Sequence, residues 1–147
     1  MQAKKRSRTR SAASSGSRPP EPLTYFLDES LDIHSVVSAL RDAGASVVRH
    51  TDRFSRGVTD EVWLAEAGAN GWVVLTRDKR IRYRQLERAA LQAAKVRAFV
   101  FTGGNVTAKD TGAILARALG RIGRVCLSVP GPFIYHVGRS ARPVRMD

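Results

Sequence analysis

Short apolar runs alternate with amphipathic segments along most of the chain, and this alternation limits the fold more than any other feature of the sequence. The runs have the length and the β-branched and aromatic content of strands, and the segments between them carry apolar residues at helical spacing. The predicted strands are residues 23–28, 46–50, 72–76, 96–102 and 133–137. The predicted helices are residues 30–44, 59–71, 81–95 and 107–122. Thr59 is the candidate N-cap of the second helix, and Gly44 and Gly71 are candidate C-caps of the first and second helices.

Strands that are apolar throughout and alternate with helices are typical of a parallel sheet with helices on both faces. The sequence therefore predicts the α/β class, with three α/β/α layers around a mostly parallel central sheet. A chain of 147 residues has the usual size of one domain, which we place at residues 21–147. Ligands of such sheets bind beyond the carboxyl ends of the strands, so we expect the functional residues there.

The chain is strongly basic, with 25 Lys and Arg residues against 13 Asp and Glu and a formal net charge of +12. A surface of this charge attracts polyanions, so nucleic acid is the first partner that the sequence predicts. Residues 1–20 hold six basic residues, no acidic residue and no large apolar residue besides Met1. We expect this segment to be a disordered basic tail.

Cysteine usage and hydropathy predict where the protein works. Cys126 is the only cysteine, which excludes an intrachain disulfide and a cysteine-rich zinc site. No apolar run approaches the ~20 residues that cross a bilayer, and the N-terminus lacks the apolar region of a secretory signal. We therefore expect a cytoplasmic protein with no membrane partner.

Acidic residues follow the predicted strands or open the helix between them. Asp28 follows the first strand, Asp60 and Glu61 open the second helix, and Asp78 follows the third strand. In a parallel sheet these carboxylates converge on one edge, and oxygen ligands of this kind suit Mg²⁺ or Mn²⁺. An Asp in such a position also caps helices in many proteins, so each carboxylate alone has a structural alternative.

Basic residues are densest directly after the third predicted strand. Residues 77–97 hold two acidic residues, Asp78 and Glu87, and eight basic ones: Arg77, Lys79, Arg80, Arg82, Arg84, Arg88, Lys95 and Arg97. A metal held by carboxylates inside a positive rim can hydrolyse phosphodiesters, since the metal generates hydroxide and stabilises the leaving oxygen. We expect the first four basic residues of the run to bind the phosphate backbone of a nucleic acid, which is RNA if the resemblance described next holds.

Two segments resemble the PIN-like domains, and most closely their compact bacterial branch, which includes relatives of the VapC-type toxins. They are LTYFLDES at 23–30 and TDEVWLAEAGANGWVVLTRD at 59–78, and the resemblance extends roughly over residues 23–137. It implies a PIN-like domain over residues 21–147, Mg²⁺ or Mn²⁺ as cofactor, and endoribonuclease activity. It also implies the role of a toxin whose partner is an antitoxin. Many relatives dimerise, which leaves a homodimer open.

The resemblance assigns roles to single residues. Asp28 matches the acidic residue after the first strand, Asp78 matches the aspartate of the T-x-D motif, and Thr76 matches its hydroxyl. The mid-chain ligand falls on Asp60 or Glu61, whose side chains point about 100° apart on a helix, and we favour Asp60.

The region after the fourth predicted strand departs from the family pattern. Many PIN domains carry a further acidic residue there, where this chain offers Asn105 and, farther on, Asp110. The site then holds three carboxylates, which puts two-metal catalysis in doubt. The alternative function is a catalytically inactive PIN-like module that binds RNA or a protein partner.

The histidines and tryptophans could also carry chemistry, but a structural role explains each of them better. The histidines His34, His50 and His136 show no metal-ligand spacing, so we place each of them in the core or on the surface. Trp63 and Trp72 are expected in the core.

Tyr83 is expected to be a buried tyrosine on a solvated helix, in preference to a contact with RNA. Gly103 and Gly104 are expected to form a turn near the site. A phosphoreceiver domain is disfavoured because the segment FIYHVGRS at 133–140 lacks the lysine that such domains need.

Overall fold

The computed structural model describes residues 22–147 and contains one six-stranded sheet in the order β2-β1-β3-β4-β5-β6. The predicted disordered tail and residue 21 lie outside the described residues. The strands are β1 Thr24–Leu27, β2 Ser46–Arg49, β3 Val73–Thr76, β4 Arg97–Phe101, β5 Phe133–Val137 and β6 Pro143–Arg145. Strands β1 to β5 are parallel, and β6 pairs antiparallel with β5 at the edge. The predicted mostly parallel sheet is confirmed.

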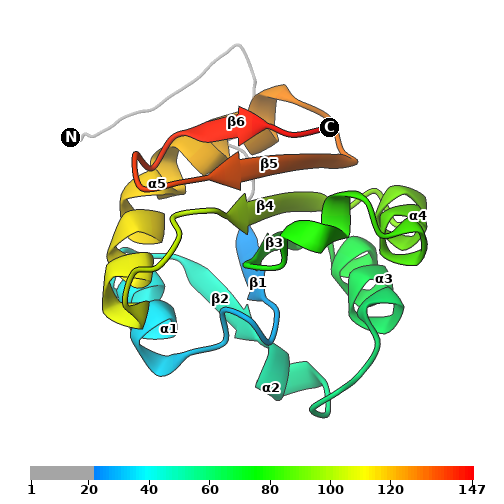
Figure 1. Ribbon diagram of the computed structural model, residues 1–147, viewed down its shortest axis with the longest axis horizontal. Coiled ribbons are helices and arrows are strands. Elements are labelled where there is room, and N and C mark those ends of the chain that lie inside the picture. Colours follow the sequence, from blue (N-terminus) through cyan, green and yellow to red (C-terminus); the bar gives the residue numbers. More distant parts are fainter. Residues whose placement is uncertain (1–21) are drawn as a thin grey trace, which may run out of the picture.

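Helices cover both faces of the sheet, as the alternation predicts. They are α1 His34–Asp42, α2 His50–Arg53, α3 Asp60–Asn70, η1 Lys79–Arg82, α4 Gln85–Ala93 and α5 Ala108–Ser128. Figure 1 shows α1 and α5 together on one side of the sheet and α3 and α4 together on the other. This is the three-layer α/β/α arrangement.

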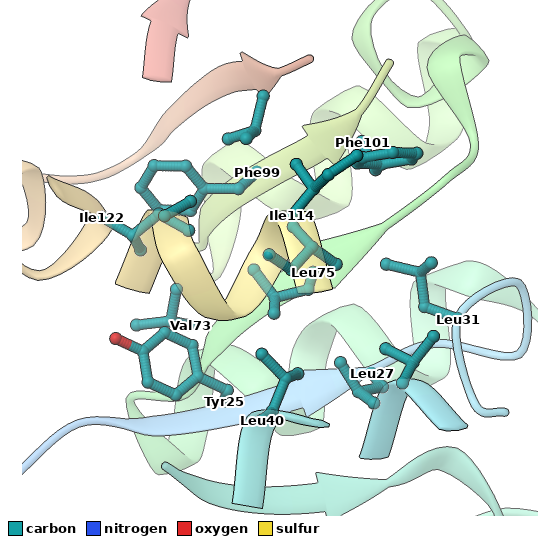
Figure 2. Close-up of a cluster of buried hydrophobic side chains, with 14 of the residues drawn as sticks. Tyr25, Leu27, Leu31, Leu40, Val73, Leu75, Phe99, Phe101, Ile114 and Ile122 are labelled. Carbon is teal, nitrogen blue, oxygen red and sulfur yellow. The ribbon is translucent and has the colours of Figure 1, made fainter. Parts of the chain in front are cut away.

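Each face of the sheet buries its own hydrophobic cluster, because strand side chains alternate between the two faces. Figure 2 shows the first cluster, in which Tyr25, Leu27 and Phe99 from the strands meet Leu40 and Ile114 from α1 and α5.

The second cluster, on the α3–α4 face, is aromatic. The rings of Phe26 and Trp72 are stacked with centroids 5.4 Å apart, and Trp63 lies 5.6 Å from Phe26. Both tryptophans are therefore core residues, as predicted.

Three predicted helices have different limits in the structure. The helix expected at 30–44 begins only at His34, because residues 29–31 form a turn in which the N–H groups of Leu31 and Asp32 donate to the Asp28 carbonyl. The helix expected at 81–95 is wrong at its start, because the Asp78 side chain accepts a hydrogen bond from the Arg80 backbone N–H and begins the short 3₁₀ turn η1. The α-helix α4 then begins at Gln85. The helix expected at 107–122 continues to Ser128 because its apolar spacing extends over Val125 and the partly buried Cys126.

Two short elements were not predicted. Helix α2 has four residues, too few to show helical periodicity. Strand β6 begins with a proline, which disfavours central strands but is tolerated at an edge. Within residues 22–147, no helix combines the length and the apolar character needed to cross a membrane.

Candidate active site

A cavity of about 630 Å³ opens at the carboxyl ends of β1 and β3, where the sheet topology predicts a site. Its lining residues are Asp28, Glu29, Ser30, Asp60, Arg77, Asp78, Lys79, Arg80 and Tyr83. The three carboxylates predicted to bind metal therefore line one cavity, together with three of the four basic residues predicted to bind RNA. Glu61 and Arg82 do not line it, and Arg82 lies against a separate cavity beside His136 and Arg145.

Asp28 lies deepest in the site, with 7% of its surface exposed. The Thr76 hydroxyl donates a hydrogen bond of 2.6 Å to Oδ2, and both the backbone N–H and the hydroxyl of Ser30 donate to Oδ1. Burial nevertheless raises the pKa of Asp28 to about 6, against the effect of these hydrogen bonds. Among residues 22–147, the buried carboxylate thus has no cation bonded to it.

Hydroxyl groups tie the ends of β1 and β3 together around Asp28. Besides donating to Asp28, Thr76 accepts a 3.0 Å hydrogen bond from the Asp78 N–H. The Ser30 hydroxyl accepts a 2.8 Å hydrogen bond from the Arg77 N–H. Thr76 itself is fully buried beneath the cavity. These bonds fix the carboxylate relative to both strands, and Ser30 is a site residue that sequence reasoning missed.

Asp60 reaches the cavity from the first turn of α3. Its Oδ1 accepts a 2.8 Å hydrogen bond from Nε1 of the buried Trp63. Thr59 occupies the predicted N-cap position, but its hydroxyl makes no capping hydrogen bond. A tryptophan one turn away therefore orients Asp60 toward the site, and the neighbouring Glu61 is turned away from the cavity lining.

Asp78 lies at the opening of the cavity and is already engaged by arginines. Its Oδ1 accepts hydrogen bonds from the backbone N–H and from Nε of Arg80, and its Oδ2 lies 3.7 Å from a guanidinium nitrogen of Arg84. About a quarter of its side chain is exposed. Its structural role as the cap of η1 and its proposed role at the site coexist.

Glu87 is a fourth carboxylate near the site that sequence reasoning did not select. It lies on α4, its Oε1 is buried without a hydrogen-bond partner, and the nearest cation, Arg84, is 3.9 Å away. Burial, together with the negative charges of Asp60, Glu61 and Asp78, raises its pKa against the effect of Arg84. In the sequence, Glu87 is distinguished only by being an acidic residue within the basic segment 77–97.

The side chains at the carboxyl ends of the strands supply oxygen ligands, which are the ligands that a hard divalent cation prefers. They offer carboxylate oxygens from four elements. Among the described residues, the Glu87 Oε1 is buried without a hydrogen-bond partner, and burial raises the pKa of both Asp28 and Glu87. In the conformation described for residues 22–147, no three His, Cys, Asp or Glu side chains have the spacing of a metal site. The carboxylates instead bond to Thr76, Trp63 and Arg80.

Several other predictions concern residues around the site. Tyr83 is 63% exposed and lines the cavity, so the prediction that it is buried is wrong; the break between η1 and α4 turns it outward. His50 is a core residue, with 1% of its surface exposed. Asn105 lines a neighbouring cavity, and Asp110 lies in the first turn of α5, where its N–H bonds to the Thr107 cap.

Comparison with known proteins agrees with this geometry. Residues 23–103, which include Asp28, Asp60 and Asp78, match the model of a PIN like domain. The chain belongs to the PIN-like domain family. It is 30% identical over 116 residues to the "Putative ribonuclease VapC45" of Mycobacterium tuberculosis, with 76% of this chain and 83% of that protein covered. No solved structure matches the chain. The predicted resemblance to VapC-type relatives is therefore confirmed.

Proposed function

We propose that this PIN-like domain is a metal-dependent endoribonuclease. The observation that carries the proposal is the single cavity in which Asp28, Asp60 and Asp78 meet Lys79 and Arg80. The mycobacterial relative is named as a ribonuclease of VapC type, which agrees with the same activity. An acidic site bordered by cations suits a reaction at a phosphodiester.

The site residues divide the work by their positions. We assign Asp28, Asp60 and Asp78, with Glu87 as a fourth candidate, to hold Mg²⁺ or Mn²⁺. The bound cation supplies Lewis-acid catalysis and an activated hydroxide. Thr76, buried between Asp28 and Asp78, keeps the Asp28 carboxylate in place.

The basic residues of the loop after β3 bind the RNA backbone and place it over the carboxylates. Arg77, Lys79 and Arg80 line the cavity, and Arg82 extends the basic surface along η1. Contacts of this kind give affinity and register without reading the base sequence. We therefore expect RNA binding to weaken steeply with salt, by about 0.7 in log K per log unit of salt for each phosphate neutralised.

The biological role that we propose is that of a toxin neutralised by a cognate antitoxin in the cytoplasm. This rests on the similarity to a VapC-named protein. Expression of the chain alone should arrest growth, and the product of a small adjacent gene should relieve the arrest and copurify with it. A sizing column would also show whether the chain forms a homodimer.

A second candidate function is a binding module that has lost cleavage. The observation in its favour is that Asp60 is bonded to Trp63 and Asp78 is paired with Arg80 and Arg84. In this version Arg80 and Arg84 neutralise Asp78 permanently, Trp63 holds Asp60, and the same surface binds RNA or a protein.

Cleavage of a labelled structured RNA with Mn²⁺, with Mg²⁺ or with EDTA separates the two functions. We expect cutting only with metal, and loss of cutting in Asp60→Asn. Asp42→Asn is the matched control. Asp42 is an exposed carboxylate at the end of α1, near the amino ends of the strands and therefore on the opposite side from the cavity. RNA that is bound but never cut under any metal condition would support the binding module and contradict the nuclease.

A further inference from the structure

A second cavity of about 630 Å³ adjoins the carboxylate cavity. Its lining residues are Arg77, Lys79, Phe101, Gly104, Asn105 and Val106. Arg77 and Lys79 line both cavities, so the two are continuous across these side chains. Ligand sites in proteins have volumes of about 300–1,000 Å³, so the second cavity is large enough to hold a ligand group.

The two cavities differ in charge. The first is lined by four acidic residues as well as basic ones, whereas the second is lined by two cations and no carboxylate. A cavity of this charge favours an anion. A strand that reaches the carboxylates would have its next phosphate near Arg77 and Lys79.

Arg77 is held in place from two sides. A terminal nitrogen donates a 3.0 Å hydrogen bond to the Gly104 carbonyl, and the guanidinium lies over the Phe101 ring at 5.2 Å from its centroid. Arginine has five N–H donors, so this single bond leaves others for a ligand. A guanidinium fixed in this way loses little conformational entropy when it binds a phosphate.

The loop between β4 and α5 is also fixed in shape. A Cβ at Gly103 would lie 2.2 Å from the Phe101 ring, and Gly104 has a φ of +74°, which favours glycine. Nε of Arg139 donates a 2.6 Å hydrogen bond to the Gly103 carbonyl. The loop therefore presents the exposed Asn105 side chain to the cavity from a rigid support.

We propose that the second cavity is a subsite for one nucleotide of single-stranded RNA, next to the phosphate that is cleaved. Arg77 and Lys79 contact the phosphate between the two nucleotides, and the Asn105 amide lies against the neighbouring base. Amide side chains donate to and accept from base edges, and single-stranded RNA offers those edges unpaired. This subsite rests on the proposed function, because it extends the path of the same RNA strand.

The test uses Asn105→Glu, which adds a negative charge to the subsite without touching the carboxylate cavity. Asn70→Glu is the matched control. Asn70 is an exposed asparagine at the end of α3, near the amino ends of the strands and therefore on the opposite side from the subsite. Binding of fluorescently labelled oligouridylates of about two, four and eight nucleotides is measured by anisotropy in EDTA. The expected result is that Asn105→Glu weakens binding of all three RNAs by about fivefold or more relative to Asn70→Glu, because even the dinucleotide carries the phosphate and the base that the subsite binds.

Equal binding by the two variants at every length would overturn the subsite, and so would the absence of any RNA binding. The measurement contains no metal and no cleavage, so its result is separate from that of the nuclease assay. A protein whose RNA binding is weakened by Asn105→Glu and not by Asn70→Glu, but which never cuts, would keep the subsite and lose the nuclease proposal.

Discussion

The floor and the rim of the carboxylate cavity are built in opposite ways. The floor consists of Asp28, Ser30 and Thr76. The rim consists of Asp78 and the two arginines that pair with it, Arg80 and Arg84. Floor residues are attached to the ends of β1 and β3, and Asp28 and Thr76 are almost completely buried. Rim residues lie on the chain between β3 and α4: Asp78 caps η1, Arg80 lies within η1, and Arg84 is the N-cap of α4. The side chains of Arg80 and Arg84 are more than a third exposed.

The difference lies in how each carboxylate is balanced. Asp28 is held by neutral hydroxyls and a backbone N–H, which fix its position but leave its charge uncompensated. Asp78 is neutralised by Arg80 and Arg84 through contacts that solvent reaches. The floor therefore provides a rigid ligand that needs a cation, and the rim can exchange its partners when metal or RNA arrives. Changes at the floor should affect chemistry, and changes at the rim should affect affinity.

The largest effect should follow from Asp28→Asn at the floor. The amide keeps the shape of the side chain but removes the charge that binds metal, so cleavage should fall by about 1,000-fold, roughly 4 kcal/mol in activation free energy. The variant should be at least as stable as the parent at pH 7, because it no longer buries a charge. Cleavage rates and urea unfolding measure the two effects, and cleavage near the parent rate would remove the floor from the mechanism.

The next effect is the pH dependence of stability that Asp28 gives to the floor. Asp28 has a folded-state pKa of about 6, above its ordinary value of 3.8. Its contribution to stability is therefore complete below pH 3.8 and is lost as the pH rises through 6. In EDTA, the free energy of unfolding of the parent should fall between pH 4 and pH 7 by up to about 3 kcal/mol more than that of Asp28→Asn. Parallel curves for the two proteins would show that burial does not perturb Asp28.

Thr76→Val tests whether the floor must be rigid. The substitution keeps the buried volume but removes the hydroxyl that joins Asp28 to the Asp78 backbone. Cleavage should fall by about tenfold, the usual effect of losing a group that orients a metal ligand. Thr76→Ser is the matched control and should retain most of the activity. Equal losses in the two variants would point to packing of the methyl group instead of the hydrogen bond.

The smallest effect should come from the rim. Arg84→Gln removes one partner of Asp78, and because the pair is exposed its loss should change stability by less than about 1 kcal/mol. Freed of this cation, the carboxylates should bind Mn²⁺ about threefold more tightly at low salt. Arg88→Gln is the control, since Arg88 lies on α4 and its guanidinium donates to the Arg82 carbonyl at the end of η1. A large loss of stability in Arg84→Gln would mean that the rim is as fixed as the floor.

The same contrast explains what the sequence could predict. The fold follows from hydrophobic periodicity, and the three aspartates follow from the rule that parallel strands place their ends at one edge. Ser30 could not be selected, because its role depends on a hydrogen bond to Arg77 that only the folded loop creates. Glu87 could not be selected either, since its approach to the carboxylates depends on the packing of α4 against α3.

The error at Tyr83 has a local cause. The predicted helix 81–95 would have turned this ring inward, but Asp78 caps a 3₁₀ turn that ends at Arg82, and the chain reorients before α4. For Asp78, capping a turn and lining a site are therefore not alternatives, because the structure combines them. The roles of Asp28, Asp60, Asp78 and Thr76 in catalysis stay predictions.

Binding of Mn²⁺ tests the central claim most directly, because the claim is that carboxylates from separate elements form one cation site. The electron paramagnetic resonance signal of free Mn²⁺ gives the affinity and the number of sites without any RNA. The account predicts saturable binding by the parent and a loss of at least about tenfold in affinity in both Asp28→Asn and Asp60→Asn, with Asp42→Asn unchanged. Absence of binding by the parent at millimolar Mn²⁺, or equal binding by all four proteins, would contradict it.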